Sequence, residues 1–132
     1  MKINTIKEQY DDVFLQDEII EEHLNGRYYI KNSINTTGYL IITNQRMIFI
    51  SNNKDILIET YDYKSLEPVA WHREITMNYI TFQYGANFYK LISNNDEEKV
   101  KNVVSNINKK IRKSNKMDPV TFIKESALRI FF

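Results

Sequence analysis

The sequence predicts a mainly β domain, in which about seven short antiparallel strands form a barrel or sandwich capped by a C-terminal helix. The chain has nine Tyr and seven Phe, and aromatic and branched side chains favour strands. Short apolar runs, separated by turn residues, fill the middle of the chain. One apolar stripe at helical spacing follows the last run, which indicates a single long helix after the strands.

The chain is expected to open with a short amphipathic helix. Apolar residues recur there at helical spacing: Ile3, Ile6, Tyr10, Val13 and Phe14. The first strand is predicted over Ile19–Ile30, and Gly26 within it indicates a bulge or a bend.

A hairpin is predicted next. Its strands, Gly38–Thr43 and Arg46–Ser51, are separated only by Asn44 and Gln45. A two-residue connection that begins with Asn is typical of a tight turn, because Asn tolerates the left-handed backbone conformation. We expect side chains along this hairpin to be alternately buried and exposed.

The remaining strands are shorter or less regular. Pro68 cannot donate a ladder hydrogen bond, so the strand that follows it should lie at a sheet edge. Alternation in the next strand places Ile80, Phe82 and Tyr84 on one face. The predicted ranges are Ile56–Tyr63, Val69–His72, Ile75–Tyr84 and Asn87–Ile92.

The capping helix is predicted over Asp96–Lys113, with Asn94 or Asn95 as its N-cap. Its apolar stripe consists of Val100, Val103, Val104, Ile107 and Ile111. Asp118 and Pro119 then indicate the start of an extra helix. The stripe of that helix consists of Val120, Ile123, Ala127, Ile130 and Phe131. We therefore expect one domain over residues 17–113, a helical N-terminal extension over 1–16 and a helical C-terminal extension over 114–132.

Composition narrows the function. The net charge is +1, which argues against a nucleic-acid partner. No Cys is present, so disulfides, thiol nucleophiles and cysteine zinc sites are excluded. Neither a signal peptide nor an apolar run of roughly 20 residues is apparent, and we expect a soluble, cytoplasmic protein.

The hairpin carries a family resemblance. The stretch from Gly38 through Thr43 and Arg46 to Phe49 resembles the Gly–hydrophobic–Thr-x-x-Arg–hydrophobic–Phe signature of bacterial pleckstrin-homology-like domains, and of YokE-like and GRAM-related members in particular. Within the hairpin, the Thr43 hydroxyl can hold the turn backbone and Arg46 can cover the barrel rim. The resemblance implies a seven-stranded barrel capped by a helix, and a binding module without assigned activity. The helix Trp of eukaryotic members is absent.

Catalysis finds little support in the sequence. His23 and His72 are the only imidazoles and lie far apart along the chain. Adjacent acids such as Asp11 and Asp12 diverge on a helix or strand and make no acid/base pair. We expect no enzyme activity, no cofactor and no metal.

A protein partner, or a second copy of the chain, is the favoured ligand. A barrel of this kind exposes an edge beside its capping helix, where an extended peptide can add as a strand. The candidate edge is Val69–Arg73, where Trp71 and His72 form an anchor-type pair. The C-terminal stripe offers a second surface, made by Val120, Ile123, Ala127 and Phe131, which either folds back on the barrel or docks on another chain.

Two alternatives remain open: a small hydrophobic ligand inside the barrel, or lipid at a membrane surface. Phosphate recognition would need clustered cations, and the candidates are Arg27, Lys31, Arg46 and Lys54. The loop over Asn32–Thr37 carries no charge, however, and Glu21 and Glu22 would oppose an anion.

Overall fold

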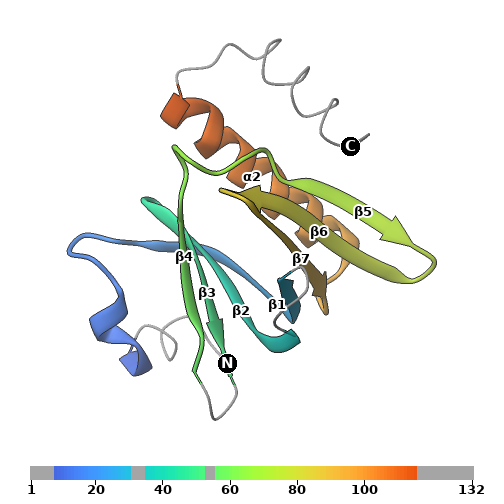
Figure 1. Ribbon diagram of the computed structural model, residues 1–132, viewed down its shortest axis with the longest axis horizontal. Helices are drawn as coiled ribbons and strands as arrows, with labels where there is room; N and C mark the ends of the chain where they lie inside the picture. The colour runs from blue at the N-terminus through green and yellow to red at the C-terminus, as the bar shows by residue number, and fades with distance from the viewer. Residues whose placement is uncertain (1–7, 31–34, 53–55, 116–132) are drawn as a thin grey trace.

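In the described part of the chain, seven antiparallel strands form one sheet, in the order β4-β3-β2-β1-β7-β6-β5, and a long helix follows them (Figure 1). The computed structural model describes residues 8–30, 35–52 and 56–115. The elements are η1 (Asp11–Val13), β1 (Ile20–Ile30), β2 (Asn35–Thr43), β3 (Arg46–Ser51), β4 (Ile58–Asp62), β5 (Ala70–Glu74), β6 (Met77–Tyr84), β7 (Asn87–Ser93) and α2 (Glu97–Asn115). The predicted fold class is therefore confirmed.

Strand β1 joins the two halves of the sheet. It pairs with β2 along its length and with β7 only from Gly26 onward. A Cβ atom on Gly26 would lie 2.0 Å from the Ile92 carbonyl oxygen, so glycine permits the close approach of β7. The register irregularity of β1 lies between Ile20 and Glu22, not at Gly26. Of the bulge or bend predicted at Gly26, the bulge is therefore wrong, and the bend stays a prediction.

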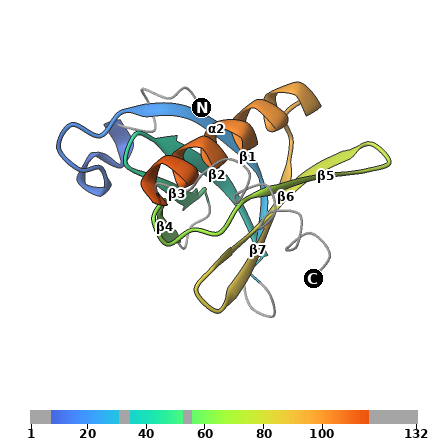
Figure 2. The same ribbon diagram turned by 90° about the horizontal axis from the view of Figure 1, so that it is seen from above.

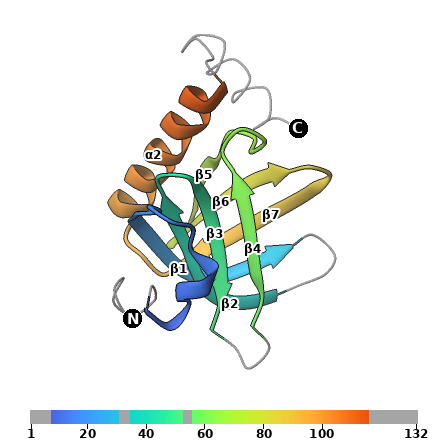
Figure 3. The ribbon, with the colours of Figure 1, turned by 90° about the vertical axis from the view of Figure 1, so that its left-hand side faces the viewer.

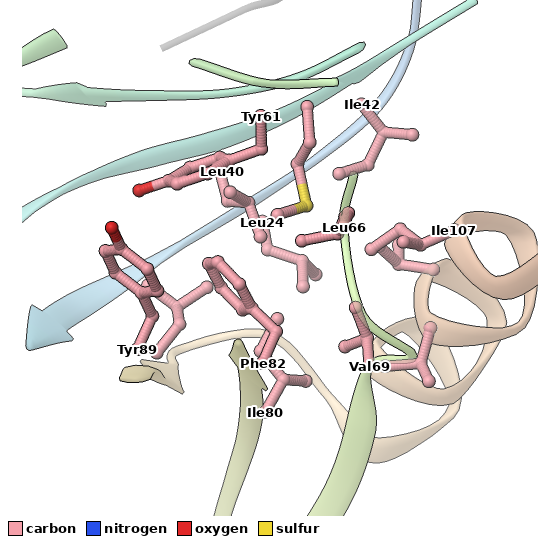
Figure 4. Packing of buried hydrophobic residues seen from close by; sticks show 14 of the residues in the cluster. Leu24, Leu40, Ile42, Tyr61, Leu66, Val69, Ile80, Phe82, Tyr89 and Ile107 are labelled. Carbon is pink, nitrogen blue, oxygen red and sulfur yellow. The ribbon is translucent and has the colours of Figure 1, made fainter. Parts of the chain in front are cut away.

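The barrel interior is filled by side chains. One buried cluster takes residues from the strands and from α2 (Figure 4). At its centre the hydroxyls of Tyr28 and Tyr61 are in hydrogen-bond contact, and the Tyr61 ring meets Phe82 and Tyr89 edge-on at 5.2 Å. Burial raises the pKa of both hydroxyls far above the ordinary value, so this polar pair stays neutral within the core.

Helix α2 lies across one end of the barrel (Figure 2). All five residues of its predicted apolar stripe are buried. Asp96 is its N-cap, because the Asp96 carboxylate accepts the Lys99 backbone N–H at 2.9 Å. The predicted caps, Asn94 and Asn95, are wrong: the Asn95 side chain instead accepts the backbone N–H of Asn25, which ties the helix start to β1.

The β2–β3 hairpin is buried on both faces, and the predicted alternation of burial is wrong there. Leu40, Ile41 and Ile42 are all fully buried. The reason is the preceding segment, which lies against the outer face of the hairpin (Figure 3). Tyr10 packs there on a cluster formed by Ile41, Ile48 and Ile50, with Val13 and Phe14 beside them.

The structure describes only part of the predicted N-terminal helix. Where it was expected to continue, Asp11–Val13 form the 3-10 turn η1. Residues 1–7 lie outside the described residues, as do 116–132, which contain the second apolar stripe. Among the helices described, none is long and apolar enough to cross a bilayer.

Candidate interaction site

The hairpin motif holds the chain that precedes the barrel. The Thr43 hydroxyl accepts the N–H groups of Gln45 at 3.1 Å and Arg46 at 3.0 Å, as predicted, and donates to the Glu18 carboxylate at 2.7 Å. Arg46 meets both Glu18 oxygens at 3.0 Å through Nε and Nη2. Nη2 also donates to the Val13 carbonyl oxygen at 2.6 Å. Arg46 therefore anchors residues 13–18, and its covering of the barrel rim stays a prediction.

Glu18 is the residue of this anchor that sequence reasoning missed. Its side chain is fully buried, whereas that of Arg46 is 16% exposed. Burial alone would raise the pKa of this carboxyl, but hydrogen bonds from Arg46, the Leu15 N–H and Thr43 outweigh it and hold the pKa below its usual value. The carboxylate is thus charged and matched by donors, as a buried bidentate pair requires.

The other motif residues also serve the fold. Phe49 is fully buried and stacks on Tyr28, with ring centroids 3.9 Å apart. Gly38 allows the facing strand to approach, since a Cβ there would lie 2.2 Å from the Ile50 carbonyl oxygen. Each of the four signature residues therefore makes close contacts within the fold.

The candidate anion-binding cations do not gather in the described part of the chain. Arg27 is exposed on β1, and Arg46 is paired with Glu18. Lys31 and Lys54 lie outside the described residues. Glu21 is paired with Lys110 at 2.8 Å and Glu22 with Asn106 at 2.9 Å, which joins β1 to α2.

The imidazoles make no constellation with acids. His72 stacks on Tyr79 at 4.9 Å and lies 2.9 Å from the Thr81 hydroxyl. Desolvation, and then the charge of Lys90, lower the pKa of His72. Within the described ranges, no three side chains of His, Asp or Glu are grouped as metal ligands would be.

The predicted edge strand does lie at an end of the sheet. Among the described strands, β5 pairs with β6 alone, and helix α2 runs beside it. Asn108 of α2 occupies both backbone groups of Val69: its Oδ1 accepts the Val69 N–H and its Nδ2 donates to the Val69 carbonyl, each at 2.9 Å. A side-chain amide here makes the two bonds that a residue of a neighbouring strand would make.

Farther along β5, Trp71 and Arg73 also contact side chains of α2. The Lys101 ammonium lies 4.5 Å from the Trp71 ring centroid. Arg73 donates to Glu97 at 2.9 Å, and Glu97 also pairs with Lys101 at 3.4 Å. Both cations are about half exposed.

His72 lies on the opposite face of β5, against Tyr79 of β6. The structure therefore brings Val69, Trp71 and Arg73 together under α2, and it separates His72 from Trp71. The two do not form one anchor, because adjacent strand residues point to opposite faces. No sequence signal indicated Asn108, Lys101 or Glu97, since polar positions on a helix have no partner that periodicity can reveal.

The family follows from a match over most of the fold. A family model described as "Bacterial PH domain", where PH denotes pleckstrin homology, matches residues 16–109. The chain belongs to the bacterial PH domain family. PH-like domains are generally non-catalytic modules that mediate protein or lipid interactions. A search of curated proteins finds no match to this sequence.

Solved structures share the fold of this bacterial PH domain at low identity. The C-terminal domain of an unknown protein from Leishmania infantum is 15% identical, with a TM-score of 0.61, and the match covers 79% of this chain and 95% of that one. The Vps36 N-terminal PH domain is 12% identical, with a TM-score of 0.58 and coverage of 76% and 83%. A DUF1696 family protein with a PH domain from Shewanella loihica is 13% identical, with a TM-score of 0.55 and coverage of 81% and 97%.

Proposed function

We propose that this PH domain is a non-catalytic protein-interaction module that binds an extended segment of a partner protein as an added strand at the β5 edge. The observation that carries the proposal is that β5 is the last of the described strands in the sheet, while on its outer side Asn108 is hydrogen-bonded to the backbone of Val69. An edge strand presents unpaired N–H and C=O groups, and peptide-binding domains use such edges.

The direction of the free backbone groups follows from Val69. Its N–H and C=O point away from β6, to Asn108. Alternate residues of a strand direct these groups to the same side, so Trp71 and Arg73 also present theirs outward. An added strand would make its main-chain bonds to these two residues.

The alternatives have weaker physical support. A carrier of hydrophobic ligands needs an open interior, whereas this barrel is filled by residues such as Leu24, Phe49, Tyr61 and Ile80. Lipid phosphate needs several convergent cations, and of the candidates in the described ranges only Arg27 is not engaged by a carboxylate.

Three finer predictions belong to the same proposal. The first is membership of the YokE-like, GRAM-related branch, and the second is a cytoplasmic location. The third is self-association through Val120, Ile123, Ala127 and Phe131. Light scattering of the full chain against a variant with Val120 and Ile123 replaced by Asp tests self-association: an oligomer is expected for the first and a monomer for the second. A monomer in both would contradict self-association and leave the β5 proposal standing.

The edge itself is tested by selection on the full chain. A phage library displaying random nine-residue peptides is panned on the natural sequence and on Arg73→Pro. Proline removes the outward N–H of residue 73 but is tolerated on an edge strand, so selected peptides are expected to lose at least tenfold in affinity. Arg73→Ala, which keeps the N–H, serves as the matched control.

Thermal unfolding followed by circular dichroism shows whether both variants remain folded. Peptides that bind Arg73→Pro as tightly as Arg73→Ala, or no enriched peptide at all, would contradict strand addition at β5. If Arg73→Pro fails to fold, protection from hydrogen exchange at the Trp71 and Arg73 amides on peptide binding to the natural chain decides the same question. Absence of that protection contradicts the proposal.

A further inference from the structure

The residues that α2 places beside β5 carry an uneven charge. Arg73 and Lys101 are both cations, and they share one carboxylate, that of Glu97, at 2.9 and 3.4 Å. The side chains of Arg73 and Lys101 are 54% and 52% exposed, and that of Glu97 is 35% exposed. In the part of the chain that the structure describes, two accessible cations therefore pair with a single acid.

This group lies where one residue of an added strand would come. Residues directly opposite each other in paired strands place their side chains on the same face. The ligand residue opposite Arg73 would thus direct its side chain toward α2, beside Arg73 and Lys101. An acidic side chain at that position would supply the second carboxylate for the two cations.

Resting on the function proposed above, we propose that the β5 edge selects an extended protein segment with Asp or Glu opposite Arg73. Asn108 limits how far along β5 a ligand strand can pair. Because its amide already occupies the backbone of Val69, main-chain pairing with the ligand stops at Trp71. The partner chemistry is therefore a short, extended, acidic segment, aligned by a helix side chain that imitates a strand residue.

The ring of Trp71 offers a second contact surface for the ligand. Lys101 lies over Trp71, and the two interact as a cation and a π face. A ligand carboxylate that drew Lys101 away from the ring would uncover an apolar surface for the ligand residue opposite Trp71, two positions along the added strand.

The selected peptides test the charge preference directly. The library enriched on the natural chain is expected to show Asp or Glu at one fixed position. Replacing Glu97 by Gln removes the competing carboxylate, so the affinity for an enriched acidic peptide should rise about two- to fivefold, the range of an exposed ion pair. Glu98→Gln is the matched control, because Glu98 is exposed, makes the same change in net charge and follows Glu97 directly.

The outcomes separate the two proposals. Equal effects of Glu97→Gln and Glu98→Gln would mean a long-range charge effect and would overturn the acidic preference. Peptides that are lost on Arg73→Pro but show no acid at a fixed position would also overturn it, while strand addition would stand. Peptides that bind Arg73→Pro as tightly as Arg73→Ala would contradict both strand addition and the acidic preference.

Asn108 has a separate readout. Asn108→Ala leaves the Val69 backbone free, so the boundary of the amides that gain protection on peptide binding should move from Trp71 to Val69 in hydrogen exchange. In the natural chain Asn108 holds the Val69 N–H before and after binding, so that amide gains no protection there. Asn108→Asp keeps one acceptor for the Val69 N–H and is expected to leave the boundary at Trp71. An unchanged boundary in Asn108→Ala would overturn the limiting role of this residue.

Discussion

The two hairpins at opposite sides of the barrel are built differently. The β2–β3 hairpin is buried on both faces and is held at its turn by the Glu18–Arg46 pair, whose carboxylate is fully buried. The β5–β6 hairpin ends the sheet at β5 among the described strands, and its ion pair, Arg73–Glu97, is open to solvent. The family signature lies in the first hairpin and the candidate binding residues in the second.

The turns of these hairpins differ in the same way. The Asn44–Gln45 turn is bonded to Gln16, Asp17 and Ile19 of the preceding segment. The β5–β6 turn contains Ile75, which is 90% exposed and has a φ of +57°, where a branched residue is strained. Buried polar contacts thus hold the β2–β3 hairpin in place, whereas the ion pair of the β5–β6 hairpin remains open to solvent.

The largest expected effect is on the Glu18–Arg46 pair. Arg46→Met should lower the free energy of unfolding by about 3–5 kcal/mol, because it leaves a buried carboxylate without its partner. Arg73→Met, at the exposed pair, should lower it by at most about 1 kcal/mol. Urea unfolding followed by circular dichroism measures both, and similar losses would contradict the contrast between the hairpins.

The second effect concerns pH. The folded state holds the pKa of Glu18 below its ordinary value, so its contribution is present above the unfolded pKa of about 4.3 and is lost as pH falls through the folded pKa. The natural chain should therefore lose stability more steeply than Glu18→Gln as pH falls from about 5 to 3. Parallel curves of unfolding free energy against pH would show that Glu18 does not titrate in this way.

The smallest effect separates backbone strain from contacts. Ile75→Gly should stabilise the chain by about 0.5–1 kcal/mol, because glycine adopts a positive φ without strain. Gly85 has a φ of +62° with nothing within 4 Å of an added Cβ, so Gly85→Ala should destabilise by about 1 kcal/mol. Thermal unfolding measures both, and a loss of stability in Ile75→Gly would show that the Ile75 side chain contributes contacts in the folded state.

The sequence predicts much of the fold because strands and α2 depend on local patterns. Strand β3 begins and ends where predicted, at Arg46 and Ser51, and β7 differs by one residue. The position of β5 at an edge followed from Pro68. What periodicity could not supply was the second buried face of β2–β3, since that depends on Tyr10 packing from a distant part of the chain.

The candidate site was predictable only in outline. Val69, Trp71 and Arg73 were expected at the edge, and they lie there. The helix residues opposite them were not, because Asn108 and Glu97 take their roles from tertiary contacts. Likewise, nothing in the spacing of Glu18 and Arg46 indicates that they meet.

The position of Trp71 has a practical consequence. It is the single tryptophan of the chain, and it lies at the β5 edge with a lysine ammonium over its ring. Tryptophan fluorescence therefore reports on this edge alone. Binding of an unlabelled ligand that displaces Lys101 would change the wavelength or the intensity of the Trp71 emission.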